Sequence, residues 1–408
     1  MNITKEVLSE KSVVIVPNEG IILFILASIN FTHIMDFVIM APLNPFLKEV
    51  FHINTRSFGL LMSAYTLSAG IFGFLASFFI DKIDRKKALV ILYIGFIVSN
   101  IFCSISRDYY FFMGSRVVAG AFGGILGALI MSIVGDAIPQ ERRGKATGIV
   151  MAAFSGASII GIPTGLYLAA KYAWYAPFIL ISILASIILV VALIYFPSMK
   201  GHMTGKKEKP IEMLTSIGGN TNLRWALLFS SLLMLSGFSV VPFISDYMVN
   251  NVGLAKEDLS YIYMFGGLAT VVSGPLVGKL SDKYGKQRTF TIAGALSILP
   301  ILLITNLPAL SKPLALVATT SFFIFFGARF VPAMALVTSS VLPFKRGSFM
   351  SINSSIQQLS SAAASFGAGL VIVNTASGAL LNFGYVGIFA AITTLLCIFI
   401  SFKVKPVS

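Results

Sequence analysis

Long apolar stretches separated by short polar segments dominate the sequence. Each stretch has about 18 residues or more, the length that an α-helix needs to cross roughly 30 Å of hydrocarbon. The pattern predicts an all-α membrane protein with twelve transmembrane helices, at residues 18–44, 56–80, 88–105, 109–135, 145–170, 174–196, 224–249, 258–281, 289–306, 314–341, 348–373 and 378–402.

The predicted spans form two halves that repeat one another. Three pairs of features recur in the same order at nearly one offset: Asp81 with Asp282 (201 residues apart), Pro139 with Pro343 (204) and Gly165 with Gly369 (204). Each half has an even number of spans, so the two six-helix repeats are parallel, and a binding site is expected between them near the midplane. We predict an N-terminal six-helix bundle (1–200), a cytoplasmic linker (201–223) and a C-terminal six-helix bundle (224–408).

Composition and charge agree with a multi-pass membrane protein. The 408 residues are 56% hydrophobic and 11% charged, against about 25% charged in soluble domains. If both termini are cytoplasmic, 22 of the 30 Lys and Arg residues lie in cytoplasmic segments and six in outer loops, as the positive-inside rule requires. We expect a cell inner membrane location. No contiguous basic face indicates nucleic acid, and no Cys/His spacing indicates a metal or another cofactor.

Two ionisable residues lie at similar depth in the first half. Asp36 is about seven residues from the outer end of the first span, and Arg116 is about seven residues into the fourth. Buried charges in a membrane are costly and usually have partners, so the two are expected to pair, either for proton coupling or as a purely structural ion pair. His33 is three residues before Asp36 on the same helical face, where it joins this site or packs between helices.

In the second half, Arg329 lies in the tenth span, three residues before Pro332. A proline there bends the helix and frees a carbonyl, so Arg329 contacts a polar or anionic substrate group or packs against neighbouring helices. Asp246 lies near the outer end of the seventh span and is a second candidate for the substrate cavity.

Two amides lie on one face of the eleventh span. Asn353 and Gln357 are four residues apart, a spacing that places both side chains on the same side of an α-helix. They either line a polar substrate cavity or form hydrogen bonds between helices.

A loop motif occurs once in each half. GKLSDKYGKQR at 278–288 contains Gly278, Asp282 and Gly285 before a basic cluster, and SFFIDKIDRKK at 77–87 contains Asp81 and Arg85. The glycines permit a tight turn, and the acid can cap a helix or pair with the basic side chains. An ordinary positive-inside turn does not explain why the pattern occurs twice.

The fifth span is rich in small residues. Three glycines and one proline occur in GIPTG and the residues just before it: Gly156, Gly161, Pro163 and Gly165. Missing side chains along a helix allow a neighbouring helix to approach closely.

Together these motifs resemble the major facilitator superfamily. GKLSDKYGKQR resembles its loop signature, although the first-half copy has Ser77 and Asp84 in place of two glycines. RVVAG at 116–120 resembles the fourth-helix motif. GIPTG followed by WYAPF, and MDFVIMAPL at 35–43, resemble the drug:proton antiporter branch, most closely the arabinose-efflux-like permeases.

The resemblance implies alternating access by two rocking halves. It places Asp81 near the start of the eleventh span and Arg85 near Asp136, in a network that latches the outward-facing state. Gly278, Asp282 and Gly285 of the second-half loop are expected to belong to the same conformational latch. Ser339 and Ser340 lie near the position equivalent to Asp136 in the second half, which argues against a symmetric latch.

The function predicted from these features is proton-coupled efflux of a small organic molecule by a monomeric secondary transporter. The partners are the substrate, protons and the lipid bilayer. The alternative is a symporter or facilitator that imports a small metabolite on the same fold. An enzyme or receptor would need a catalytic constellation or a signalling domain, and ATP-driven transport would need a Walker-type loop, neither of which the sequence contains.

Overall fold

The computed structural model describes residues 19–139, 142–204, 210–342 and 345–407. Within them the chain is almost entirely helical. The helices of the first half are α1 (Glu19–Ile39), α2 (Asn44–Val50), α3 (Thr55–Ala76), α4 (Arg85–Ile105), α5 (Tyr109–Ala137), α6 (Arg143–Gly156), α7 (Ile162–Lys171) and α8 (Ala176–Tyr195), with a π-helical turn, η3, at Ala157–Gly161 between α6 and α7.

The second half begins with α9 (Pro210–Gly219), which lies in the predicted linker. It continues with α10 (Thr221–Val240), α11 (Ile244–Asn250), α12 (Leu259–Tyr284), α13 (Lys286–Ile304), α14 (Lys312–Ala328), α15 (Phe330–Ser339), α16 (Arg346–Val371) and α17 (Phe383–Ser401). The short strands β1 (Val373–Asn374) and β2 (Leu380–Leu381) pair antiparallel. Short 3-10 turns occur at Ile80–Lys82 (η2), Gly201–Thr204 (η4), Val241–Phe243 (η5) and Lys256–Asp258 (η6).

The predicted all-α membrane fold is confirmed. Among the described residues, eleven helical segments are long and apolar enough to cross a membrane. The twelfth long segment is α16, whose 26 residues extend about 39 Å at 1.5 Å per residue. It is less apolar than the others because it carries a run of Ser, Asn and Gln, and most of its buried positions pack against other helices of the protein.

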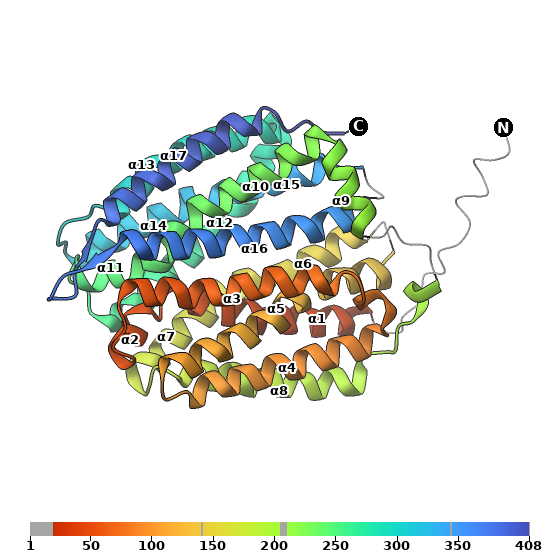
Figure 1. Ribbon diagram of the computed structural model, residues 1–408, viewed down its shortest axis with the longest axis horizontal. Coiled ribbons are helices and arrows are strands. Elements are labelled where there is room, and N and C mark those ends of the chain that lie inside the picture. Colours follow the sequence, from red (N-terminus) through yellow and green to blue (C-terminus); the bar gives the residue numbers. More distant parts are fainter. Residues whose placement is uncertain (1–18, 140–141, 205–209, 343–344, 408) are drawn as a thin grey trace.

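Packing inside the two halves follows one pattern. Helix α1 packs on α6 and α8, as α10 packs on α16 and α17. Helices α3 and α4 pack on α5, as α12 and α13 pack on α14. This correspondence is what a parallel six-helix repeat requires. Between the halves, α3 lies along α16 (Figure 1), and α12 packs on α7 and the π-helical turn.

Glycines allow these contacts between the halves. A Cβ on Gly59 of α3 would lie 2.6 Å from the backbone oxygen of Ser365 on α16, and one on Gly267 of α12 would lie 2.9 Å from that of Ser158 in the π-helical turn. Any larger side chain at either position would force the two helices apart.

Polar residues at the span boundaries begin the helices. The side chains of Asn54, Asp84, Asp108 and Asn220 accept hydrogen bonds from the first free backbone N–H groups of α3, α4, α5 and α10. Such caps satisfy donors that have no partner within the helix.

Three span boundaries differ from the prediction. The first span ends at Ile39 and a separate helix, α2, follows, because Pro42 and Pro45 interrupt the chain. The last helix begins at Phe383, since the β-hairpin occupies the start of the predicted span 378–402. The linker contains α9, which packs on α10 and α16 through the buried Met213, and its residues 205–209 lie outside the described part.

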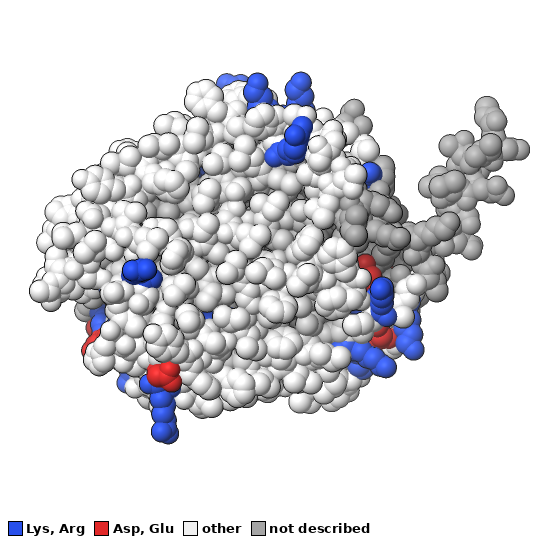
Figure 2. All heavy atoms as spheres, viewed as in Figure 1, with Lys and Arg blue, Asp and Glu red and all other residues white. Residues whose placement is uncertain are grey.

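The surface fits a lipid environment. Large apolar side chains such as Phe24 and Phe399 are about two-thirds exposed, at 68% and 71%. Figure 2 shows a broad uncharged surface over most of one face, with the charged side chains gathered mostly near its edges. Lipid, not water, is the solvent that such a surface requires.

Candidate functional site

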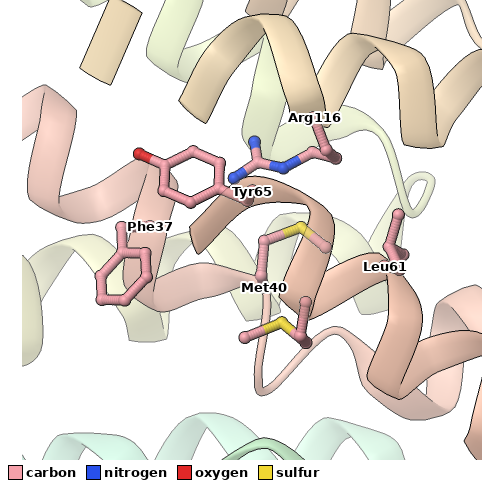
Figure 3. Close-up of a pocket in the computed structure, with 6 residues that line it drawn as sticks. Phe37, Met40, Leu61, Tyr65 and Arg116 are labelled. Carbon is pink, nitrogen blue, oxygen red and sulfur yellow. The ribbon is translucent and has the colours of Figure 1, made fainter. Parts of the chain in front are cut away.

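A buried ion pair joins α1 and α5 in the first half. Nη1 of Arg116 donates to Oδ1 of Asp36 at 2.6 Å, and both side chains are fully buried. The guanidinium also lies over the ring of Tyr65 on α3, 4.5 Å from its centroid (Figure 3). The contact that the sequence predicted is therefore present, with an aromatic ring as a third member.

Two polar atoms of this ion pair have no hydrogen-bond partner in the described chain, and the space beside the pair is narrow. Oδ2 of Asp36 and Nε of Arg116 are buried without hydrogen-bond partners among the described residues. A narrow space beside Arg116, lined also by Phe37, Met40, Leu61, Met62 and Tyr65, is too small to admit a water molecule (Figure 3). The second carboxylate oxygen of Asp36 is therefore buried without a partner among the described residues.

His33 lies on α1 beside this pair. Its ring packs against Gly123 and Gly127 of α5, where an added Cβ would lie 3.1 and 3.4 Å from it, and against Phe96 of α4. Its Nδ1 has no hydrogen-bond partner among the described side chains and backbone groups. The glycines of α5 thus leave room for an imidazole next to Asp36.

Arg329 is the buried cation of the second half, and it lies at the break between α14 and α15 that Pro332 predicted. Its Nη1 donates to Thr394 of α17 at 2.8 Å and to Ser236 of α10 at 3.1 Å, and its Cζ lies 4.0 Å from the ring centroid of Phe326. No acidic side chain in the described chain pairs with it, and its Nε and Nη2 have no partner. Arg329 is therefore a buried cation with two free donors.

The two predicted amides both lie on α16. Asn353 is fully buried, and neither atom of its amide has a partner within the described residues. Gln357 is half-buried and donates to Sδ of Met334 on α15 at 3.6 Å. A buried amide without partners is rare in folded proteins and indicates a place for water or a ligand.

Polar contacts join the halves at one end of the bundle. Asp246 of α11 pairs with Lys48 of α2 at 2.7 Å and accepts from Asn250. The side chain of Thr55 donates to Asn374 at 2.7 Å. Two further contacts join Asn44 with the carbonyl of Pro242 and Glu49 with Lys256. The structure thus places Asp246 in this cluster, which we name the outer contact; its role in a substrate cavity stays a prediction.

At the opposite end, the 77–87 loop carries a second ion-pair cluster. Arg85 is almost fully buried and pairs with Asp136 of α5 at 2.8 Å and with Asp81 at 2.9 Å. Arg85 and Asp136 thus lie together, as the family resemblance implied. The equivalent acid of the second half, Asp282, is exposed and has no ion pair among the described residues.

The two loops use different backbone conformations. Gly285 has φ = +91° between α12 and α13, a conformation that favours glycine. At the corresponding place Asp84 has φ = −52° and caps α4, accepting from the backbone of Lys86 and Lys87 and from Ser198. Burial raises the pKa of Asp84, but these hydrogen bonds outweigh it and hold the pKa below its usual value. A helix cap therefore takes the place of the glycine in the first half. On α12 of the second half, a Cβ added to Gly278 would make only an ordinary contact with Val331, at 3.9 Å.

Three of the five glycines in the fifth span (Arg143–Lys171) face α1. A Cβ on Gly156, Gly161 or Gly165 would lie 3.4, 3.2 or 2.8 Å from side chains of α1. Gly156 and Gly161 are five residues apart, and a regular α-helix would place them on different faces. The π-helical turn between them brings both onto the face toward α1. The backbone N–H of Ile162 donates to the carbonyl of Ala157 and closes this turn. Pro163 follows in the first turn of α7. The small-residue face thus lets this span pack against the helix that carries Asp36.

Several site residues were not predicted. Tyr65, Ser236 and Thr394 contact the two buried arginines, and Lys48 pairs with Asp246. Hydroxyls and a tyrosine in apolar spans give no signal of their own, and Lys48 is one of the six basic residues of the predicted outer loops. Within the described chain no group of three His, Cys, Asp or Glu residues is arranged to hold a metal ion.

Comparison with known proteins identifies the family. The model of the Major Facilitator Superfamily matches residues 26–365. The MFS-type transporter YceJ of Bacillus subtilis (strain 168) is 25% identical over 327 residues, which are 80% of this chain and 83% of that protein. The transporter AraJ of Escherichia coli (strain K12) is 25% identical over 279 residues, 66% and 67% of the two chains.

Solved structures share the fold. A single-residue mutant of the nucleoside transporter NupG superposes with a TM-score of 0.75 at 12% identity, covering 94% of this chain and 99% of its own. The D-xylose-proton symporter superposes with a TM-score of 0.75 at 14% identity, covering 93% and 97%. With a family match over most of its length and this fold, the chain belongs to the major facilitator superfamily and is a multi-pass membrane transporter, not an enzyme.

Proposed function

We propose that this transporter is a proton-coupled exporter of a small organic molecule, of the drug:proton antiporter branch, and that it works by alternating access. The observation that carries the proposal is the buried pair of Asp36 and Arg116, whose carboxylate keeps one oxygen without a partner. The carboxylate of Asp36 is buried in the first half, and it can be neutralised either by the guanidinium of Arg116 or by a proton. These are the properties expected of a site that binds and releases a proton.

In the proposed cycle, Asp36 is ionised while Arg116 holds it and takes a proton when the pair loosens, because burial disfavours an unpaired carboxylate. His33, Asn353, Gln357 and Arg329 contribute polar groups to the proton and substrate pathway. One proton moving inward across 100 mV releases about 2.3 kcal/mol, which is enough for a roughly 50-fold substrate gradient at 1.36 kcal/mol per factor of ten.

The resemblance of the fifth span to the antiporter motif supports export over import. Three of the span's five glycines pack on α1, and its π-helical turn meets α12 of the other half, so it links the proposed proton site to the interface between the halves. π-Helical turns occur frequently at functional sites. The alternative is a proton symporter or facilitator for import on the same fold. We further propose a monomer in the cytoplasmic membrane with both termini in the cytoplasm.

The test is transport in proteoliposomes with an imposed pH gradient. A library of drugs, sugars and metabolites is first screened for thermal stabilisation of the purified protein, and the stabilising compounds are then assayed. We expect substrate to move opposite to the proton flux and to stop moving when a protonophore collapses the gradient. Movement of substrate in the same direction as protons would favour the symporter. Transport that does not depend on the pH gradient would contradict proton coupling.

A second proposal concerns the cluster of Arg85, Asp81 and Asp136, which we propose to be a conformational latch. Replacing Asp81 with Asn removes one of two carboxylates that hold the buried Arg85, so the distance distribution between spin labels on the two halves should shift at that end of the bundle. Asp282→Asn is the matched control, since Asp282 is exposed. Identical distributions for Asp81→Asn and the parent protein would rule the latch out.

A further inference from the structure

A cavity of about 410 Å³ lies on the second half, between α12, α13 and α14. Its walls are almost wholly apolar and include Val277, Leu280, Ile292, Leu296 and Phe325, with Arg288 also in its lining. Leu280, Ile292 and Leu296 are 46–52% exposed, so the cavity is open to the surroundings of the helices. We name it the lateral groove. It is separate from the ion pair of Asp36 and Arg116.

The length of the lateral groove matches one leaflet of a bilayer. On α12 its lining runs from Ser273 to Tyr284, which is about 16 Å at 1.5 Å per residue. The hydrocarbon of a bilayer is roughly 30 Å thick, so one leaflet is about 15 Å. The groove therefore starts at the turn between α12 and α13 and ends near mid-membrane.

The mouth of the groove is positively charged. The segment 279–288 carries four basic residues and one acid, Asp282. Arg288 lies in the groove lining, is exposed, and has no ion pair with any acid in the described part of the chain. The turn is on the side that the positive-inside rule assigns to the cytoplasm, where anionic head groups attract basic segments.

We propose that the lateral groove binds one anionic phospholipid. An acyl chain lies between α12, α13 and α14, and the phosphate accepts hydrogen bonds from Arg288, whose planar guanidinium suits phosphate oxygens. In a membrane the open side of the groove faces lipid tails, so an acyl chain is the occupant whose apolar surface and length fit it. The bound lipid contacts α12, which packs on α7 of the other half, and Ala328, the residue before Arg329.

The experiment is native mass spectrometry of the full chain, purified and delipidated, then titrated with phosphatidylglycerol or with phosphatidylcholine. We expect one phosphatidylglycerol to stay bound under conditions that remove phosphatidylcholine. Arg288→Gln should lower its occupancy about tenfold, the effect of one charge-assisted hydrogen bond. Val277→Trp and Ile292→Trp, which fill the groove from two walls, should each do the same.

Two matched controls separate the groove from general lipid binding. Val272→Trp adds the same ring to an exposed position of α12 outside the groove, and Arg224→Gln removes one exposed positive charge from the start of α10. Both should retain the lipid as the parent does, with all variants monodisperse. Full retention by both tryptophan variants would overturn the site, and full retention by Arg288→Gln or equal binding of phosphatidylcholine would overturn the phosphate contact. None of these outcomes depends on proton coupling or transport direction.

Discussion

Asp36→Asn is expected to abolish gradient-driven transport while the protein still folds. Asparagine keeps the shape of the side chain and a carbonyl that accepts from Arg116, and the ring of Tyr65 still lies under the guanidinium. It cannot ionise, so no proton can be exchanged for the arginine contact. The substrate ratio across the membrane should fall from as much as about 50 per 100 mV to 1.

The measurement is substrate accumulation in proteoliposomes under an imposed pH gradient, together with proton release on substrate binding in detergent. The matched control is Asp246→Asn, which removes another fully buried acid but one that belongs to the outer contact. Asp246→Asn should change the rate of transport but leave its dependence on the pH gradient unchanged. Accumulation by Asp36→Asn equal to that of the parent would assign the coupled proton to another group.

Arg116→Gln is expected to destabilise the fold by about 3–5 kcal/mol, the cost of removing one partner from a buried ion pair. The carboxylate of Asp36 is fully buried and would lose its only charged partner among the described residues. The free energy of unfolding by denaturant in lipid–detergent micelles measures this loss. The double variant Asp36→Asn, Arg116→Gln should recover most of it, because no charge is then left unpaired.

Arg329→Gln gives the contrasting case. Arg329 has no acid beside it, and its Nε and Nη2 lack partners within the described chain. Its replacement therefore leaves no buried carboxylate without a partner. The free energy of unfolding should fall by about 1–3 kcal/mol, the net value of its two hydrogen bonds to the hydroxyls of Thr394 and Ser236. A loss as large as that of Arg116→Gln would mean that Arg329 has a structural role comparable to that of the first-half pair.

The features that follow from one-dimensional spacing could be predicted from the sequence. Counting residues from the span ends placed Asp36 and Arg116 at the same depth, and two charges at one depth in a membrane have a strong reason to meet. The bend before Pro332 follows from its missing N–H. The shared offset between halves predicted the repeat because duplicated units preserve loop residues such as Asp81 and Asp282.

Features that depend on three-dimensional packing could not be predicted. The π-helical turn adds one residue to a helix, and no residue type between Ala157 and Gly161 specifies it. The pairing of Lys48 with Asp246 depends on how the halves meet, which hydropathy does not describe. Strand β2 lies at the start of the last predicted span, in residues apolar enough to extend it. It is separated from the helix by the left-handed backbone of Asn382 and by tertiary contacts such as that of Leu380 with Asn251.

Because of the outer contact, the apparent affinity of the transporter for a ligand depends on the side of the membrane from which the ligand arrives. Its polar contacts contribute roughly 0.5–1.5 kcal/mol each; if together they favour closure by about 2.8 kcal/mol, only about 1% of molecules are open at that end. A ligand arriving there would bind with an apparent dissociation constant about 100-fold weaker than the intrinsic one, whereas a ligand arriving at the opposite end would not bear this cost. The outer contact thus lowers the apparent affinity of the binding site for solute that arrives from its own side of the membrane.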